Sequence, residues 1–167
     1  QMTHSSIMPM DLHGVRQYVY AASSGVVSAA ADDGRILWHY DDWRVPIATV
    51  PSPVPLPGNR VLLSAGYDAG MKLLAVRQGE DGRFEVGVEK HVAADVFGVE
   101  QHTPVLHGGR IYAISIVTGN PAVCLGGNGE IISTTGREIN FERGPLLMVD
   151  DILLALTGKT GELVMLR

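Results

Sequence analysis

The stretch Gly109-Arg110-Ile111-Tyr112-Ala113-Ile114 decides the fold of this chain, together with Thr118-Gly119-Asn120 and residues 121–125 that follow it. In order, these residues predict an apolar strand, a glycine-containing turn and a second apolar strand. The same order occurs in three other segments, which are residues 16–30, 59–76 and 150–166. The chain is therefore expected to contain four copies of one repeat.

The spacing of the copies indicates which repeat architecture they form. Taken as equivalent, the corresponding residues Tyr18, Val61, Ile111 and Ile152 are separated by 43, 50 and 41 positions. A period of about 40 to 50 residues is typical of the blades of a β-propeller.

Two further strands flank each of these strand pairs. A strand that contains proline precedes each pair, and these strands are expected at residues 5–10, 52–56, 103–106 and 144–148. Another strand follows the first three pairs, at residues 36–40, 84–88 and 130–133. An Asp-Gly or Asn-Gly step comes before each of these, and such steps supply the positive φ angles of tight hairpins. Each unit therefore reads as a four-stranded antiparallel meander.

The sequence thus predicts an all-β chain, a β-propeller of about four blades built from four-stranded antiparallel meanders. A single partial propeller is expected over residues 1–167, with its blades at residues 4–44, 47–92, 101–136 and 143–167. The last blade is expected to be incomplete, with three strands. No window of a dozen residues carries an uninterrupted helical period.

Two segments resemble a known family. Residues 31–40 contain an Asp-Asp-Gly-Arg turn and then an apolar step that ends at Trp38, and residues 102–113 read His-Thr-Pro-Val-Leu-His-Gly-Gly-Arg-Ile-Tyr-Ala. These segments resemble the two halves of the PQQ-like, or quinoprotein-type, repeat. The resemblance covers nearly the whole chain, although the tryptophan is clear only in the first unit. It implies a propeller and leaves the function open, because such repeats serve enzymes, assembly factors and sensors.

The resemblance also implies a larger assembly. Members of this family usually have about eight blades, so the chain is expected to be half of an eight-bladed ring, the C-terminal portion of a larger propeller. Flat end faces and an unpaired edge open to water would favour association. We therefore expect a second propeller half as partner, in a homodimer or as the remainder of a parent chain. The alternative is a compact four-bladed propeller.

Composition argues against several classes of function. The net charge of −5 gives no electrostatic footprint for nucleic acid. The longest apolar runs are too short to span a bilayer. Cys124 is the only cysteine, lies in an apolar stretch and is expected to be buried. A lone cysteine forms no intramolecular disulfide.

Candidate binding residues lie just before the innermost strand of each blade, because in a propeller these positions converge at one mouth of the central channel. The residues found there can hydrogen-bond, and they are His4, Ser5, Ser52, Glu100, Gln101, His102 and Arg143. This set predicts a site for a small polar ligand or an ion. The alternative is that the side chains only solvate the channel.

Other chemistry has less support in the sequence. No Gly-x-Ser-x-Gly elbow marks a nucleophilic serine, and His4 and His102 lack a short metal-binding spacing. The turns at Asp33 and Asp81 are far from a calcium-loop pattern. Trp38 is expected to pack between blades. We therefore predict no catalytic residue and no cofactor, neither PQQ nor calcium.

Three functions remain open at this point. The first is a non-catalytic binding or scaffold module that recognises a protein, a peptide or a small solute, in part by strand addition. The second is a part of a PQQ-dependent quinoprotein dehydrogenase, whose adjacent cysteine pair this chain cannot supply. The third is a solute sensor at the channel mouth. We favour the first, and the resemblance implies a periplasmic or secreted bacterial protein.

Overall fold

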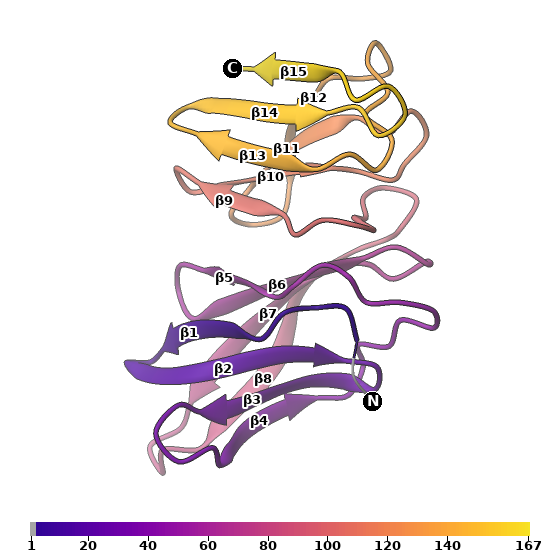
Figure 1. Ribbon diagram of the computed structural model, residues 1–167. Helices are drawn as coiled ribbons and strands as arrows, with labels where there is room; N and C mark the ends of the chain where they lie inside the picture. The colour runs from indigo at the N-terminus through magenta and orange to yellow at the C-terminus, as the bar shows by residue number, and fades with distance from the viewer. Residues whose placement is uncertain (1–2) are drawn as a thin grey trace.

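The computed structural model describes residues 3–167, and this range contains strands, turns and loops but no helix. The strands form four separate antiparallel sheets in chain order, which are the four blades of a β-propeller (Figure 1). The predicted all-β propeller is confirmed. Within the same range, no helix is available that is long and apolar enough to cross a membrane.

Each blade is a meander in which neighbouring strands pair in chain order. Blade 1 consists of β1 (Met8–Leu12), β2 (Val15–Ala22), β3 (Gly25–Ala30) and β4 (Ile36–Tyr40). Blade 2 consists of β5 (Val54–Leu56), β6 (Arg60–Ala65), β7 (Gly70–Gln78) and β8 (Phe84–Val92). Blade 3 consists of β9 (Val105–His107), β10 (Arg110–Ile114), β11 (Ala122–Gly126) and β12 (Ile131–Thr134). Blade 4 has three strands, β13 (Leu146–Val149), β14 (Ile152–Leu156) and β15 (Leu163–Leu166).

The hydrophobic core is divided into three clusters, and each cluster lies between two neighbouring blades. Blades 1 and 2 share a cluster to which Trp38 and Val61 belong. Blades 2 and 3 share one that includes Leu73 and Ile111. Blades 3 and 4 share a smaller one around Phe141. A blade therefore buries its apolar faces only by stacking on its neighbours, as expected for a repeat architecture.

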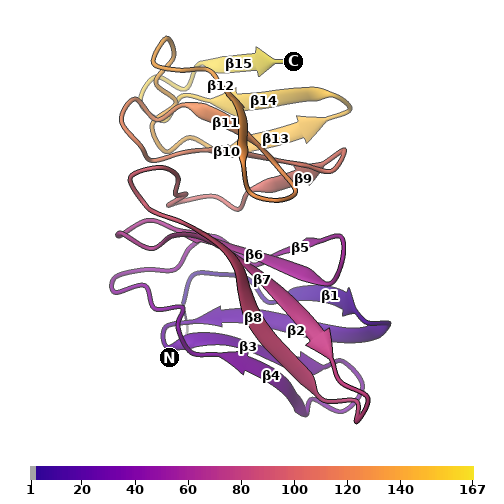
Figure 2. The same ribbon diagram turned by 180° about the vertical axis from the view of Figure 1, so that it is seen from behind.

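The blades form an arc with blade 1 at one end and blade 4 at the other. β1–β4 lie at the bottom and β13–β15 at the top in both views (Figures 1 and 2). Across residues 3–167, no core cluster joins blade 4 to blade 1. Each end blade therefore has one sheet face without a neighbouring blade.

Several strand bounds and one repeat equivalence differ from the sequence-based expectation. All four innermost strands begin two or three residues later than expected, at Met8, Val54, Val105 and Leu146. The blade-4 counterpart of Val61 and Ile111 is Leu153 and not Ile152. Leu153 is buried on the side that faces blade 3, and alternation along β14 puts Ile152 on the other face.

Candidate functional site

The predicted channel-mouth residues lie in the four segments that lead into β1, β5, β9 and β13. In Figure 1, β1, β9 and β13 run in the same direction, so the segments that lead into them lie on the same side of the molecule. Hydrogen bonds and an ion pair connect these leading segments from one blade to the next.

Hydroxyl groups make the first of these connections. The backbone N–H of Ser6 donates to Ser52 Oγ at 2.9 Å, and the N–H of Ser52 donates to Thr103 Oγ1 at 2.9 Å. All three residues lie two positions before an innermost strand, and Gly144 takes this position in blade 4. The Ser52 hydroxyl therefore joins blades 1 and 2, which is a structural role whether or not a ligand binds nearby.

An ion pair connects blades 3 and 4. Arg143 Nε lies 2.9 Å from Glu100 Oε1, and Arg143 Nη2 donates to Glu100 Oε2 at 3.2 Å. The Glu100 side chain is only 12 % exposed, whereas that of Arg143 is 56 % exposed. A Cβ on Gly66 would lie 2.8 Å from Glu100 Cγ, so the glycine leaves room for this carboxylate. The two-point geometry fixes the guanidinium and neutralises most of its charge.

His102 is bound within its own blade. The backbone N–H of Ile114 donates to His102 Nε2 at 3.0 Å, so this nitrogen carries a lone pair and the proton resides on Nδ1. Burial lowers the pKa of His102 to about 4, which keeps the ring neutral at pH 7. The ring thus satisfies the last N–H of β10, and its Nε2 is already engaged.

The buried neutral ring of His102 predicts an acid-sensitive fold. As the pH falls below about 6.5, the unfolded chain binds a proton at this histidine before the folded chain does, because the folded pKa is lower. Stability is therefore complete above pH 6.5 and is lost toward pH 4. Between pH 7 and pH 5 we expect His102 to account for a loss of about 2 kcal/mol in the free energy of unfolding.

Urea titrations at each pH measure this effect, and His102→Gln is the matched variant. Glutamine retains an acceptor for the Ile114 N–H but does not titrate. The loss between pH 7 and pH 5 is expected to be about 2 kcal/mol smaller in this variant than in the unmodified chain. Equal losses in the two proteins would show that His102 is not the group responsible.

The other predicted residues are less constrained. His4 is exposed, and its backbone N–H donates to Thr49 O at 3.1 Å. Ser5 is buried with its hydroxyl 3.3 Å from Ser6 O, and Gln101 is exposed. The structure thus brings Glu100 and Arg143 together, whereas His4 belongs to the opposite end blade. In the described part of the chain, no three His, Cys, Asp or Glu side chains are grouped to hold a metal ion. The small-ligand site at the channel mouth stays a prediction.

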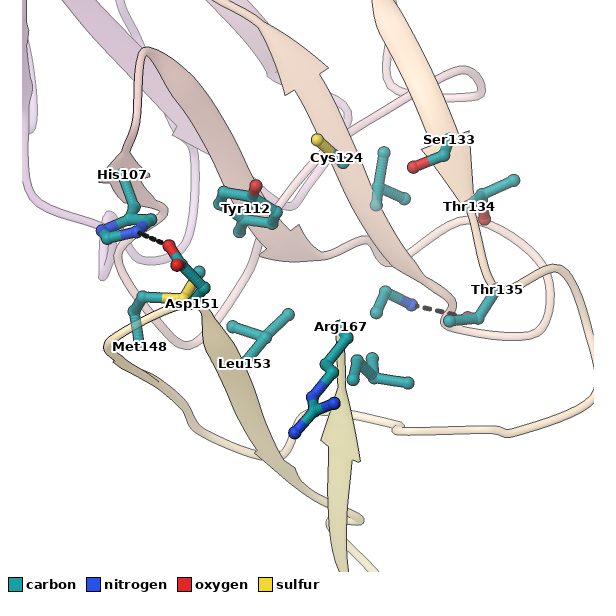
Figure 3. Close-up of a pocket in the computed structure, with 13 residues that line it drawn as sticks. His107, Tyr112, Cys124, Ser133, Thr134, Thr135, Met148, Asp151, Leu153 and Arg167 are labelled. Carbon is teal, nitrogen blue, oxygen red and sulfur yellow. Dashed lines mark hydrogen bonds and ion pairs between the residues drawn. The ribbon is translucent and has the colours of Figure 1, made fainter.

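The structure contains a second candidate site that the sequence reading missed. A crevice of about 280 Å³ lies between blades 3 and 4 (Figure 3). Tyr112, Cys124 and Ser133 line it from blade 3, and Leu153 and Leu166 line it from blade 4. The expected burial of Cys124 is confirmed, since the thiol is on this wall and not on the surface.

Polar groups lie at the rim of this crevice. His107 Nε2 is 3.0 Å from Asp151 Oδ1, which ties blade 3 to blade 4 at one end. The exposed Arg167 side chain and the hydroxyls of Thr134 and Thr135 line another part of the rim. The crevice therefore has an apolar floor and a rim that can donate and accept hydrogen bonds, which is the usual character of a ligand pocket.

Strand register explains why space exists here. In blade 1 the pairing of the third and fourth strands shifts just after Ser28, which lies opposite Trp38. The same shift follows Cys124 in blade 3, and Cys124 lies opposite Ser133. Ser133 therefore occupies the blade-3 position that Trp38 occupies in blade 1. The small Ser133 side chain thus lines the crevice at the register position where the Trp38 indole of blade 1 is buried.

Blade 2 fills the corresponding position differently. Its register shift follows Leu73, which lies opposite Lys90. The Lys90 chain passes Gly129 of blade 3, and its Nζ lies 3.8 Å from Glu130 Oε1. Alkyl groups of a long side chain can cover apolar surface while the charge stays in water. Of the three inter-blade spaces, the one between blades 3 and 4 is thus left open.

In comparisons with known proteins, no protein-family model matches the sequence and no curated protein matches it. The resemblance to PQQ-like repeats therefore stays a prediction from sequence.

Proposed function

We propose that the chain is a non-catalytic binding or scaffold module of the PQQ-like repeat class, which recognises other polypeptides and forms part of a larger propeller. The remaining blades would come from a second copy of the chain or from the rest of a longer polypeptide. One observation carries this proposal, namely the apolar composition of the sheet face of blade 4 on which no other blade packs within residues 3–167.

This surface, called the terminal face here, consists entirely of large apolar side chains. They are Leu147, Val149, Ile152, Leu154, Leu156, Leu163 and Met165. The strand register places Leu147, Leu154 and Met165 in one row across the three strands. Leu147 and Met165 are 60 % and 70 % exposed. A contiguous apolar patch of this kind marks an interaction site on a soluble protein.

The opposite end of the arc offers a complementary surface. Tyr18 and Ile36 are exposed on the face of blade 1 that points away from blade 2, and Tyr18 lies opposite Pro9. Ser6 takes the position at which Ser52 and Thr103 each accept an N–H from the preceding blade. Both ends thus present exposed apolar side chains on a sheet face, and the blade-1 end also carries a hydroxyl at the position that connects blades inside the chain.

The solution mass of the chain tests this proposal. Light scattering on a chromatographic peak is expected to give twice the 17.9 kDa of one chain at micromolar concentration. Leu154→Glu places a charge at the centre of the terminal face and is expected to weaken association at least about tenfold, because the charge would be desolvated. Ile47→Glu, at an exposed residue outside this face, is the matched control and should leave the mass unchanged.

A monomer at all concentrations would contradict completion of the propeller by a second copy of the chain, and so would a dimer that Leu154→Glu leaves intact. The absorbance spectrum of the same peak addresses the alternative, a part of a PQQ-dependent quinoprotein dehydrogenase. A quinone band would favour that alternative and count against the non-catalytic proposal. The periplasmic or secreted location rests on the resemblance alone and goes with this proposal as an expectation.

A further inference from the structure

We propose that the crevice between blades 3 and 4 binds a free aromatic molecule of one or two fused rings that carries a hydrogen-bonding group, the class to which phenol and indole belong. This inference goes beyond the recognition of polypeptides proposed above and does not depend on it. The residues that carry it lie between positions 112 and 153, inside blades 3 and 4.

One wall of the crevice is a row of three side chains that crosses the sheet of blade 3. Tyr112 on β10 lies opposite Cys124 on β11, and Cys124 lies opposite Ser133 on β12. All three line the crevice. Figure 3 shows them along blade 3, with Leu153 of blade 4 on the other side of the space. This wall therefore presents a phenol ring, a thiol and one short hydroxyl side chain.

The corresponding rows of blades 1 and 2 end in long side chains. The fourth-strand residue of the row is Trp38 in blade 1 and Lys90 in blade 2. Trp38 is buried, and the Lys90 chain passes Gly129 of the next blade. Protein interiors are close-packed, so such side chains normally occupy the space between neighbouring elements. Ser133 is too short to do the same, and an unfilled crevice lies beside it.

A fourth strand on the following blade does not replace the long side chain. β8 is the fourth strand of blade 2, and it contacts β4 at the outer end of the space between blades 1 and 2. Trp38 is nevertheless buried in that space, where Phe84 and Val86 of β8 pack against the same cluster. Both the indole and the facing strand are thus needed to fill it. The short side chain on β12 is therefore a property of blade 3 itself.

The lining of the crevice favours an aromatic ring over an aliphatic group. Cys124 and Met148 each contribute a sulfur-containing side chain, and Tyr112 contributes a ring. Sulfur atoms and aromatic rings both make favourable contacts with the face or edge of another ring. Val123 and Leu153 add apolar contacts from the two blades. A planar ring between the blades would therefore touch one of these groups on each side.

Two hydroxyl groups are available to the polar group of the ligand. Within residues 3–167, Tyr112 Oη and Ser133 Oγ make no hydrogen bond to another residue, although both side chains line the crevice. The neighbouring Thr135 hydroxyl is already engaged, since it accepts the Ala122 N–H at 3.1 Å. A free hydroxyl oxygen accepts a hydrogen bond from a phenol O–H or an indole N–H. These two groups would fix the orientation of the ring.

The volume of the crevice agrees with a ligand of this size. The space measures about 280 Å³. An apolar cavity of about 150 Å³ holds benzene, whereas pockets for drug-sized ligands extend from about 300 to 1,000 Å³. The crevice therefore suits one ring or two fused rings with a polar group.

Cys124 provides a direct readout, because it is the only cysteine and lines the crevice. The probe is indole, whose Kd is measured by isothermal titration. The rate at which a thiol reagent modifies Cys124 is then followed with and without indole. At an indole concentration about ten times the Kd, modification is expected to slow roughly tenfold, since only the unliganded chain reacts. Cyclohexanol at the same concentration, an aliphatic ring with a hydroxyl group, is expected to slow it less than about twofold.

Ser133→Trp places an indole at the register position that Trp38 has in blade 1 and so fills the crevice from within. Its affinity for indole is expected to be at least about tenfold weaker than that of the unmodified chain. Ile132→Trp adds the same side chain at a neighbouring residue that is 54 % exposed and does not line the crevice. This control is expected to change the affinity no more than about twofold.

Several results would overturn the inference. Modification of Cys124 that indole does not slow is one, and equal affinities of Ser133→Trp and Ile132→Trp for indole are another. Equal protection by cyclohexanol and indole would indicate a general apolar space and not an aromatic site. N-Acetyl-tryptophanamide is expected to bind no more tightly than indole, and an affinity at least about tenfold higher would assign the ring to a polypeptide. The first of these tests uses the unmodified chain, so it holds even if a variant fails to fold.

Discussion

Replacing Trp38 by alanine is expected to lower the free energy of unfolding by about 3–5 kcal/mol, the usual range for truncating a buried tryptophan. The indole is 4 % exposed and fills the space between blades 1 and 2. It also donates to Gln17 Oε1, which accepts a second hydrogen bond from Ser28 Oγ at 2.7 Å. The variant removes apolar area, leaves a cavity and weakens a buried polar network at once. Urea denaturation at fixed protein concentration measures the loss.

Two variants separate these contributions. Trp38→Phe retains most of the apolar area and loses the Nε1–H donor, so we expect a smaller cost of about 1–2 kcal/mol. Ile36→Ala, on the same strand but 61 % exposed, is expected to cost no more than about 0.5 kcal/mol. Added indole should stabilise Trp38→Ala more than the unmodified chain, because only the variant has an empty ring-sized space between blades 1 and 2. A cost below about 1 kcal/mol for Trp38→Ala would mean that this ring does not join the blades.

The fold could be predicted from sequence because its determinants are local. Alternating apolar residues and Asp-Gly or Asn-Gly turns specify meanders without reference to distant parts of the chain. The strand bounds were harder to predict. β8 reaches Val92, beyond the expected residue 88, since its register shift opposite Leu73 lets pairing continue to Met71. Such a bulge depends on the partner strand and leaves little trace in the local pattern.

For the candidate sites as well, local sequence patterns could be interpreted, whereas contacts between distant residues could not. Polarity before each innermost strand predicted a channel-mouth cluster, but not that Ser52 and His102 would serve as acceptors for backbone N–H groups. Tertiary hydrogen bonds decide which polar atoms at the channel mouth remain available to a ligand. The crevice depends on a residue that is small where its counterpart is large. Aligning Ser133 with Trp38 would have indicated it, but that alignment requires the bulge seen only in the paired strands.

Inter-blade packing is weakest at the end of the arc formed by blades 3 and 4. Blades 1 and 2 share a large cluster that includes both tryptophans. Blades 3 and 4 share a small cluster of four buried residues, and the open crevice lies beside it. Regions with few buried apolar contacts open at lower free energy than the rest of a protein. Blade 4 is therefore the part of the chain whose packing a partner would stabilise most.

Replacing Gly144 by alanine is expected to distort blade 4 where the segment leading into β13 packs on the end of β14, and to cost about 3 kcal/mol of stability. A Cβ at this position would overlap the carbonyl oxygen of Leu156 and lie 2.7 Å from its carbonyl carbon. Both atoms belong to backbone that is held in place, since the N–H groups of Gly144 and Gly158 both donate to Phe141 O at 3.1 Å. The clash cannot be relieved by rotating a side chain, so the segment leading into β13 must move.

Hydrogen exchange locates this effect, and urea denaturation gives its size. In Gly144→Ala, amide protection in β13, β14 and β15 should fall at least about tenfold more than in blades 1 and 2, because the clash lies within blade 4. Gly87→Ala is the matched control: a Cβ there meets nothing within 4 Å, and this glycine has no positive φ. That control is expected to stay within about 0.5 kcal/mol of the unmodified chain. If Gly144→Ala behaves like Gly87→Ala, the close packing of Gly144 on Leu156 inside blade 4 is wrong.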